Sequence, residues 1–162
     1  MADKTLDDLF HHTLKDVFYA ETAITKALPK MAKAAKSKEL RHAFEKHLKQ
    51  TEGQIERLRQ VFDIIGKKAE GVPCEAIKGI LLEGDEVADE FKGTTALDAG
   101  LIAAAQAVEH YEISRYGALR TWAEDLGLQD AAKLLQETLS EEEDTDKSLT
   151  KLAETKANAA AM

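Results

Sequence analysis

The sequence predicts an all-α fold, a four-helix bundle in which a long helical crossover joins helices two and three. Apolar residues recur at helical spacing through most of the 162 residues, and the strong helix formers Ala, Leu, Glu and Lys dominate the composition. Breaks near residues 36 and 127 divide this pattern into two pairs of helices with short connections. Nearly thirty residues separate the two pairs, which is enough for the chain to cross the whole length of the bundle.

The first pair of helices has clear start and stop signals. One apolar stripe runs from Leu6 to Met31, and Ser37 is a suitable N-cap for the helix that follows. The second stripe runs from Leu40 to Phe62, and Gly66 ends it. Because the connection near residue 36 is short, we expect these two helices to be antiparallel neighbours.

The crossover and the second pair follow. Residues 67–73 are expected to be a loop, and a shorter helix is expected from Glu75 to Phe91. A Gly93-Thr94-Thr95 break then opens the third long helix, which Gly127 ends. The fourth helix carries the last apolar stripe as far as Leu152. A crossover of this length is typical of ferritin-like folds.

One domain is expected to span residues 1–158, with a flexible tail over residues 159–162, because the alanine-rich end should fray. The net charge of −8 argues against a nucleic-acid partner, since few basic groups would neutralise phosphates. The N-terminus does not resemble a signal peptide, and no apolar run approaches the ~20 residues that cross a bilayer. Cys74 is the only cysteine, which favours a reducing compartment. We therefore expect a cytoplasmic protein with no membrane partner.

The two pairs of helices resemble each other in sequence. Shifting the first pair by 91 positions, without a gap, lays Glu21 on Glu112 and Leu48 on Leu139, and the two turns coincide. A duplicated helical hairpin is the simplest account of this match.

Polar side chains interrupt the apolar stripe of every long helix. On the first helix, Glu21 fills the slot between Val17 and Ile24. On the third and fourth helices the interruption is a pair of acidic residues three or four positions apart, which share one helix face. The polar residues on the stripes are Glu21, His47, Thr51, Glu109, Glu112, Glu142 and Asp146.

Counting residues from the hinges places these side chains in two layers. Four of them lie fifteen residues from the nearest hinge, about 22 Å at ~1.5 Å per residue. This first layer contains Glu21, Thr51, Glu112 and Glu142. If the two hinges lie at opposite ends, the remaining three are displaced by about one turn toward the same end. The second layer contains His47, Glu109 and Asp146.

Buried carboxylates without a counter-ion would be too costly for a small domain, and Lys and Arg concentrate on the outer faces. Bound metal is the economical solution, and oxygen-rich ligands with one imidazole suit one or two ions of iron or manganese. The candidate ligands are Glu21, His47, Glu109, Glu112, Glu142 and Asp146. The alternative for a single Glu is an edge position that reaches solvent, and for His47 a hydrogen-bonded place in the core. We expect Glu143 to be solvated and His110 to point off the face of Glu109.

The strings H-L-K-Q-T-E-G-Q-I-E-R-L and V-E-H-Y-E-I-S-R-Y-G-A-L carry a family resemblance. Together with E-T-A-I-T-K-A-L-P-K-M and L-S-E-E-E-D-T-D-K-S-L, they resemble the YciE/YciF family of ferritin-like bacterial stress proteins. The likeness runs from about Leu6 to Leu152. It implies a dimeric, cytoplasmic, stress-associated protein with the ferritin-like fold.

Rubrerythrin-like di-iron sites offer a finer comparison. They use a Glu from helix one, a Glu-x-x-His from helix two, a Glu-x-x-Glu from helix three and a further Glu, with a ligand one turn on, from helix four. By this resemblance, the matching carboxylates are Glu21, Glu109, Glu112, Glu142 and Asp146. Helix two departs from the pattern, because Thr51 replaces the bridging Glu and Gln54 replaces the His. His47, one turn away, could substitute.

The leading hypothesis is a ferritin-like metal-binding protein of stress defence, with ferrous iron oxidised by peroxide or oxygen if the centre is catalytic. The alternative is a non-enzymatic stress protein with a degenerate metal site, in which the bundle acts as a dimeric scaffold. A homodimer is expected under both hypotheses, since symmetric dimers are the commonest oligomers.

Overall fold

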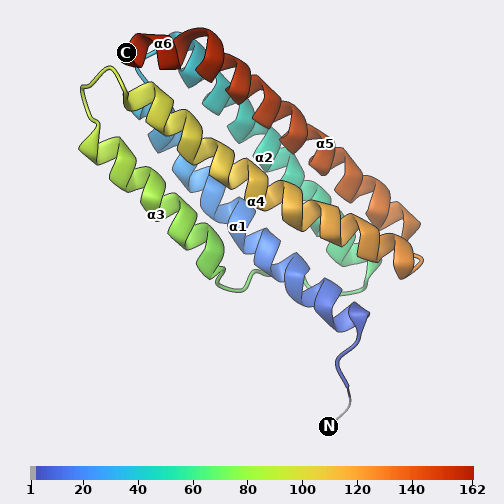
Figure 1. The fold of residues 1–162 in the computed structure, drawn as a ribbon. Helices are drawn as coiled ribbons and strands as arrows, with labels where there is room; N and C mark the ends of the chain where they lie inside the picture. Colours follow the sequence, from blue (N-terminus) through green and yellow to red (C-terminus); the bar gives the residue numbers. More distant parts are fainter. Residues whose placement is uncertain (1–2) are drawn as a thin grey trace.

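The computed structural model describes residues 3–162 and contains no strand within them. Its helices are α1 (Leu6–Ala34), α2 (Lys38–Ile64), α3 (Glu75–Glu90), α4 (Leu97–Asp125) and α5 (Gln129–Leu152), followed by the π-helical turn η1 (Ala153–Ala157) and α6 (Asn158–Ala161). The four longest helices, α1, α2, α4 and α5, run side by side, and α3 lies outside them against α1 and α4 (Figure 1). The all-α prediction is confirmed.

The two hinges lie at opposite ends of the molecule, as the two-layer prediction requires (Figure 1). The first hinge joins α1 to α2, and Ser37 caps α2 by accepting the amide of Leu40 at 3.2 Å. The second hinge joins α4 to α5 at Gly127, whose φ of 74° is a left-handed conformation that a glycine adopts without strain. The loop after α2 and then α3 bring the chain back to the first hinge, where α4 begins.

Asp98, in the first turn of α4, fixes the first hinge. Its two carboxylate oxygens accept the backbone amides of Lys36 and Ser37 at 2.7 and 2.8 Å. The carboxylate is largely buried, so it satisfies amides that lie before the start of α2. The first turn of α4 therefore stabilises the hinge between α1 and α2.

The crossover packs closely on the long helices. Cys74 caps α3, and its Sγ lies 3.1 Å from the hydroxyl of Tyr111 on α4. On α4, a Cβ added to Gly100 would lie 2.6 Å from Cγ1 of Val87, so α3 approaches α4 more closely there than alanine would allow. This packing holds the crossover against the face formed by α1 and α4.

The apolar core is divided into two clusters, with polar residues between them. The cluster toward the first hinge includes Ile24, Phe44 and Leu101. The cluster toward the second hinge includes Phe62 and Leu119. The stripe of each long helix thus passes from one cluster to the other through the level where polar side chains were predicted.

The alanine-rich end after Ala153, which was expected to fray, is helical as far as Ala161 and buries Ala157 against the first apolar cluster. This apolar contact near the first hinge stabilises the helical conformation of the segment. Flexibility of residues 159–162 stays a prediction. Among the helices of residues 3–162, none is both long and apolar enough to cross a bilayer.

Candidate metal centre

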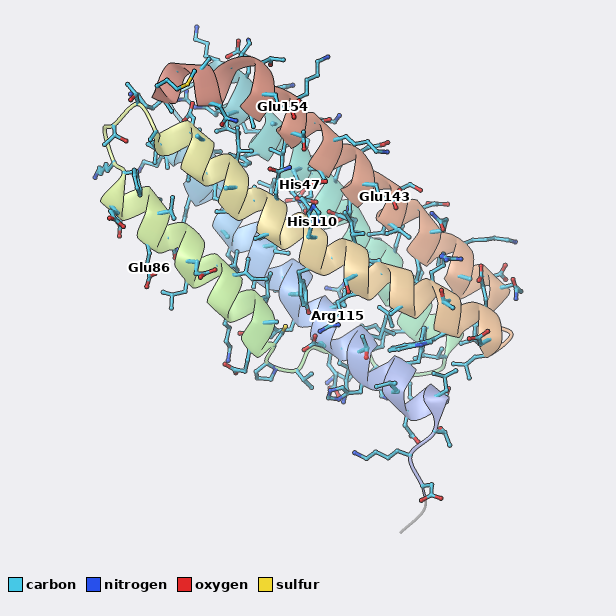
Figure 2. The ribbon with its side chains drawn as sticks, viewed as in Figure 1. His47, Glu86, His110, Arg115, Glu143 and Glu154 are labelled. Atoms are coloured by element: carbon cyan, nitrogen blue, oxygen red, sulfur yellow. The ribbon has the colours of Figure 1, made fainter. Side chains whose placement is uncertain are left out.

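Five ionisable side chains meet between the two apolar clusters. Glu21 comes from α1, His47 from α2, Glu109 and Glu112 from α4, and Glu142 from α5. None of the five residues is more than 3% exposed. The predicted burial of these side chains is confirmed, and all four long helices contribute to the group. Figure 2 shows the position of His47 near the middle of the long helices, and Glu143 on the outside of α5.

Four of these residues form a compact set. One ligand atom from each of His47, Glu109, Glu112 and Glu142 lies within 4.8 Å of the others. Nε2 of His47 lies 3.0 Å from Oε1 of Glu109 and 3.9 Å from Oε2 of Glu142. A group of three carboxylates and one imidazole at this spacing has the dimensions of a cation site, because one ion could contact all four.

Glu21 is the fifth buried side chain and adjoins this set. Its Oε1 accepts a hydrogen bond from the hydroxyl of Tyr116, a fully buried residue of α4. Oε2 of Glu21 has no hydrogen-bond partner. Glu112 and Glu142 are close enough to influence the pKa of Glu21. The Glu21 carboxylate therefore lies next to the four-residue set without being part of it.

Most of the ligand atoms in the group lack a hydrogen-bond partner. Both oxygens of Glu112 and of Glu142, Oε2 of Glu109 and both ring nitrogens of His47 are buried and unpaired. The 3.0 Å contact between His47 and Glu109 is therefore not aligned as a hydrogen bond. Within residues 3–162, the salt bridges of Lys and Arg involve none of these carboxylates. Buried polar atoms are nearly always paired, so these ligand atoms fit a bound cation.

Burial changes the acidity of the whole group. It raises the pKa of Glu21 to about 8, with a further contribution from the charge of Glu142. Burial also raises the pKa of Glu109 to about 7. The pKa values of Glu112 and Glu142 are raised well above the ordinary range, first by burial and then by the neighbouring carboxylates. Without a cation, the group therefore holds protons near neutral pH.

The sixth predicted ligand, Asp146, does not join the group. It lies one turn beyond Glu142 on α5, and its side chain is 21% exposed. Its Oδ1 accepts a hydrogen bond from Gln106 at 3.1 Å, and its Oδ2 lies 3.2 Å from Nε2 of His110. The His110 side chain is mostly exposed, so it points away from the buried face of Glu109. Metal ligation by Asp146 stays a prediction and would require its carboxylate to turn away from both partners.

Comparison with known proteins places the chain in a family. The family model described as "Domain of unknown function (DUF892)" matches residues 5–162. The chain belongs to the DUF892 family. Protein YciF of Escherichia coli (strain K12) is 48% identical over 151 residues, which are 93% of this chain and 91% of that protein. The resemblance predicted from the sequence strings is confirmed.

Solved structures agree with this assignment. The crystal structure of the E. coli stress protein YciF matches with a TM-score of 0.92 and 47% identity, over 96% of this chain and 99% of that one. YcfI from Rhodopseudomonas palustris matches with a TM-score of 0.89 and 49% identity, over 91% and 94% of the two chains, and its description proposes a structural role. A protein of Xanthomonas campestris, 20% identical with a TM-score of 0.77 over 96% of both chains, shares the fold.

In this DUF892 member, Thr51 and Gln54, which replace two ligands of rubrerythrin-like sites, make other contacts. The hydroxyl of Thr51 donates to the backbone carbonyl of His47 at 2.9 Å. The amide of Gln54 donates to Oε2 of Glu141 at 3.0 Å, and Arg57 holds the same carboxylate with two hydrogen bonds of 2.6 and 2.9 Å. The sequence reasoning missed this ion pair beside the group, although Arg57 lies one turn after Gln54 and Glu141 directly precedes Glu142.

Proposed function

We propose that this chain is a ferritin-like four-helix-bundle protein of the bacterial stress response that binds iron or manganese between its long helices. The observation that carries the proposal is the set of buried, unpaired ligand atoms on His47, Glu109, Glu112 and Glu142. A polar group of this kind destabilises the fold unless something binds to it. The YciF-like stress family and the helical arrangement are consistent with this reading.

The residues present fit a metal ion. His47, Glu109, Glu112 and Glu142 would hold one ion, with oxygen ligands in the majority and one imidazole, a set that suits iron or manganese. Glu21 would contribute its free Oε2 to a second ion or remain a partner of Tyr116. Three ionised carboxylates and a neutral histidine carry a charge of −3, which would balance a trivalent ion and exceed the charge of a divalent ion by one.

The chain's own residues have three tasks in this centre. They replace water around the ion, since the five residues are almost completely buried. The carboxyl groups release the protons that burial makes them hold, so binding should liberate protons near neutral pH. Tyr116 orients Glu21 through its hydroxyl. Bound iron would supply redox chemistry, and the reaction we propose is the oxidation of ferrous iron by dioxygen or peroxide.

Metal analysis tests the proposal. Protein purified without chelator, or loaded anaerobically with ferrous iron, should contain iron or manganese. Glu112→Gln should lower the metal content and leave the helical circular dichroism spectrum unchanged, because a glutamine side chain keeps the shape of glutamate and lacks its charge. Glu143→Gln is the matched control, since Glu143 is exposed on the same level of α5. Absence of metal after anaerobic loading would refute the metal-binding function.

A second function has an observation in its favour. Thr51 and Gln54 occupy the positions of two ligands in rubrerythrin-like sites, and the R. palustris relative is described in structural terms. Under this alternative, the bundle is a scaffold and the acidic group is a remnant. Replacing Glu21 and Glu142 together by Leu should then raise the melting temperature without changing association. A metal-dependent loss of stability in that variant would favour the metal centre instead.

We further propose a cytoplasmic homodimer, the assembly that the family resemblance implies. Sedimentation equilibrium of the purified chain should give twice the mass of one 17.8 kDa chain. A monomer would contradict the dimer and leave the metal centre untouched, because all five buried residues come from one chain.

A further inference from the structure

A cavity of about 80 Å³ lies beside the candidate metal centre. His47 and Glu109 form part of its wall, whereas Glu21, Glu112 and Glu142 do not. The cavity therefore meets the centre at one end only, the end that faces the first hinge and the apolar cluster around Phe44.

The wall of the cavity changes from polar to apolar with depth. Its outer residues include Lys46 on α2 and Asp144 and Ser148 on α5, all of which are exposed. The buried apolar residues of its wall are Ile24, Leu28, Phe44, Ala105, Val108 and Leu149. The wall thus has exposed polar residues on α2 and α5, the half-buried Gln50 and Thr145, and a buried part that is apolar except for His47 and Glu109.

This lining favours a small, neutral, apolar ligand. An ion would lose its hydration against the apolar wall with nothing to replace it, and the mouth carries one basic and one acidic residue, so it attracts neither sign of charge strongly. Water needs two to four polar partners in such a place, and the six buried apolar side chains of the wall offer none. Apolar cavities of roughly 150 Å³ in proteins take benzene or xenon. A cavity of about half that size suits a smaller neutral apolar molecule.

We propose that this cavity binds dioxygen and admits it to the His47–Glu109 end of the metal centre. The oxidant would then reach the ion from the side of His47 and Glu109, whereas Glu112 and Glu142 do not line the cavity. Binding in the cavity requires only the apolar walls. Delivery to a metal ion rests on the proposed function, so the two parts can be tested apart.

Xenon tests the binding in the metal-free protein. Crystals pressurised with xenon should show a xenon atom between Ile24 and Leu149. Ala105→Leu should abolish this xenon, because the longer side chain would extend from the wall into the cavity. Ala107→Leu is the control, since Ala107 lies exposed on the same helix. Wild-type crystals without xenon in the cavity would overturn the proposal.

Nitric oxide, a neutral diatomic molecule, tests delivery. In protein loaded anaerobically with ferrous iron, Ala105→Leu should retain its iron and bind nitric oxide more slowly than the wild type and Ala107→Leu. Ser148→Phe, which narrows the mouth, provides a second variant if Ala105→Leu does not fold. Equal rates in all proteins would overturn the proposed route. A protein that binds xenon in the cavity but takes up no iron would support the cavity and refute the metal-binding function.

Discussion

Tyr116 on α4 donates a hydrogen bond to Glu21 on α1, and both residues are completely buried. The bond joins the two halves of the sequence repeat, since Glu21 is the counterpart of Glu112, one turn before Tyr116. The other oxygen of the Glu21 carboxylate, Oε2, is buried without a hydrogen-bond partner. The Tyr116 phenol therefore helps to orient the Glu21 carboxylate.

Tyr116→Phe should destabilise the metal-free protein by about 1–3 kcal/mol, because Glu21 would lose its partner and remain buried. Urea unfolding at pH 7 measures the change. Tyr19→Phe is the control, because Tyr19 is only partly buried and lies outside the centre. Equal stabilities of Tyr116→Phe and the wild type would show that the bond contributes nothing to the fold.

The metal-free protein should lose stability as the pH rises from about 5 to 8. Burial raises the pKa of Glu21 to about 8 and that of Glu109 to about 7, whereas both groups titrate near 4.5 when unfolded. The folded state therefore binds more protons than the unfolded state in this window, so the stabilisation is complete below pH 4.5 and is lost as pH passes the folded-state pKa values. The loss should be on the order of 1 kcal/mol or more per group.

Thermal unfolding in the presence of a chelator checks this pH dependence, with Glu21→Gln as the comparison. The variant should show a shallower slope, since a glutamine at this position does not titrate. Addition of ferrous or manganous ion should reverse the trend, because ligands bind the ion in their deprotonated form. A metal-free protein that becomes more stable between pH 5 and 8 would contradict the raised pKa values.

Arg57→Ala should destabilise the contact between α2 and α5 by about 1–2 kcal/mol. Arg57 forms two hydrogen bonds with Glu141 and an ion pair with Glu137 at 3.2 Å. Burial alone would raise the pKa of Glu141, but hydrogen bonds from Arg57 and Gln54 outweigh it and lower the pKa. Lys133→Ala is the control, because its pair with Asp130 is mostly exposed and should contribute little. Denaturant unfolding of both variants tests the difference.

Two glycines of α4 should respond to alanine in opposite directions. A Cβ at Gly100 would lie 2.6 Å from the Val87 side chain, so Gly100→Ala should push α3 away and destabilise the protein. At Gly117 the added Cβ meets no atom within 4 Å, and Gly117→Ala should stabilise the helix by up to about 1 kcal/mol. Melting temperatures of the two variants provide the test. Stabilisation by Gly100→Ala would mean that α3 is not tightly seated.

Much of the fold was predictable because helix periodicity and capping are local. Ser37, Gly66 and Gly127 mark helix ends in the sequence and in the structure. The burial of Glu21 and Glu112 was also predictable, since both occupy stripes that are otherwise apolar. These inferences need only the spacing of residues along one helix.

The fine geometry of the centre was not predictable, because it depends on side-chain rotamers and on contacts between helices. Asp146 shares a face with Glu142, but its contacts with Gln106 and His110 hold its carboxylate outside the buried group. The hydrogen bond from Gln54 to Glu141 likewise depends on how far α2 and α5 are shifted along each other. The turns determine this shift only to within a residue or two. The number of residues between a side chain and its hinge does not determine these contacts.

The position of Asp98 bears on how the repeat could have arisen. Its carboxylate serves the amides of Lys36 and Ser37, which belong to the other hairpin. A chain ending after α2 would lack this acceptor, and its share of the acidic group would face water. An ancestral single hairpin would thus have needed a second copy of itself to form a closed interior. Fusion of the two copies would have made the association of the hairpins intramolecular.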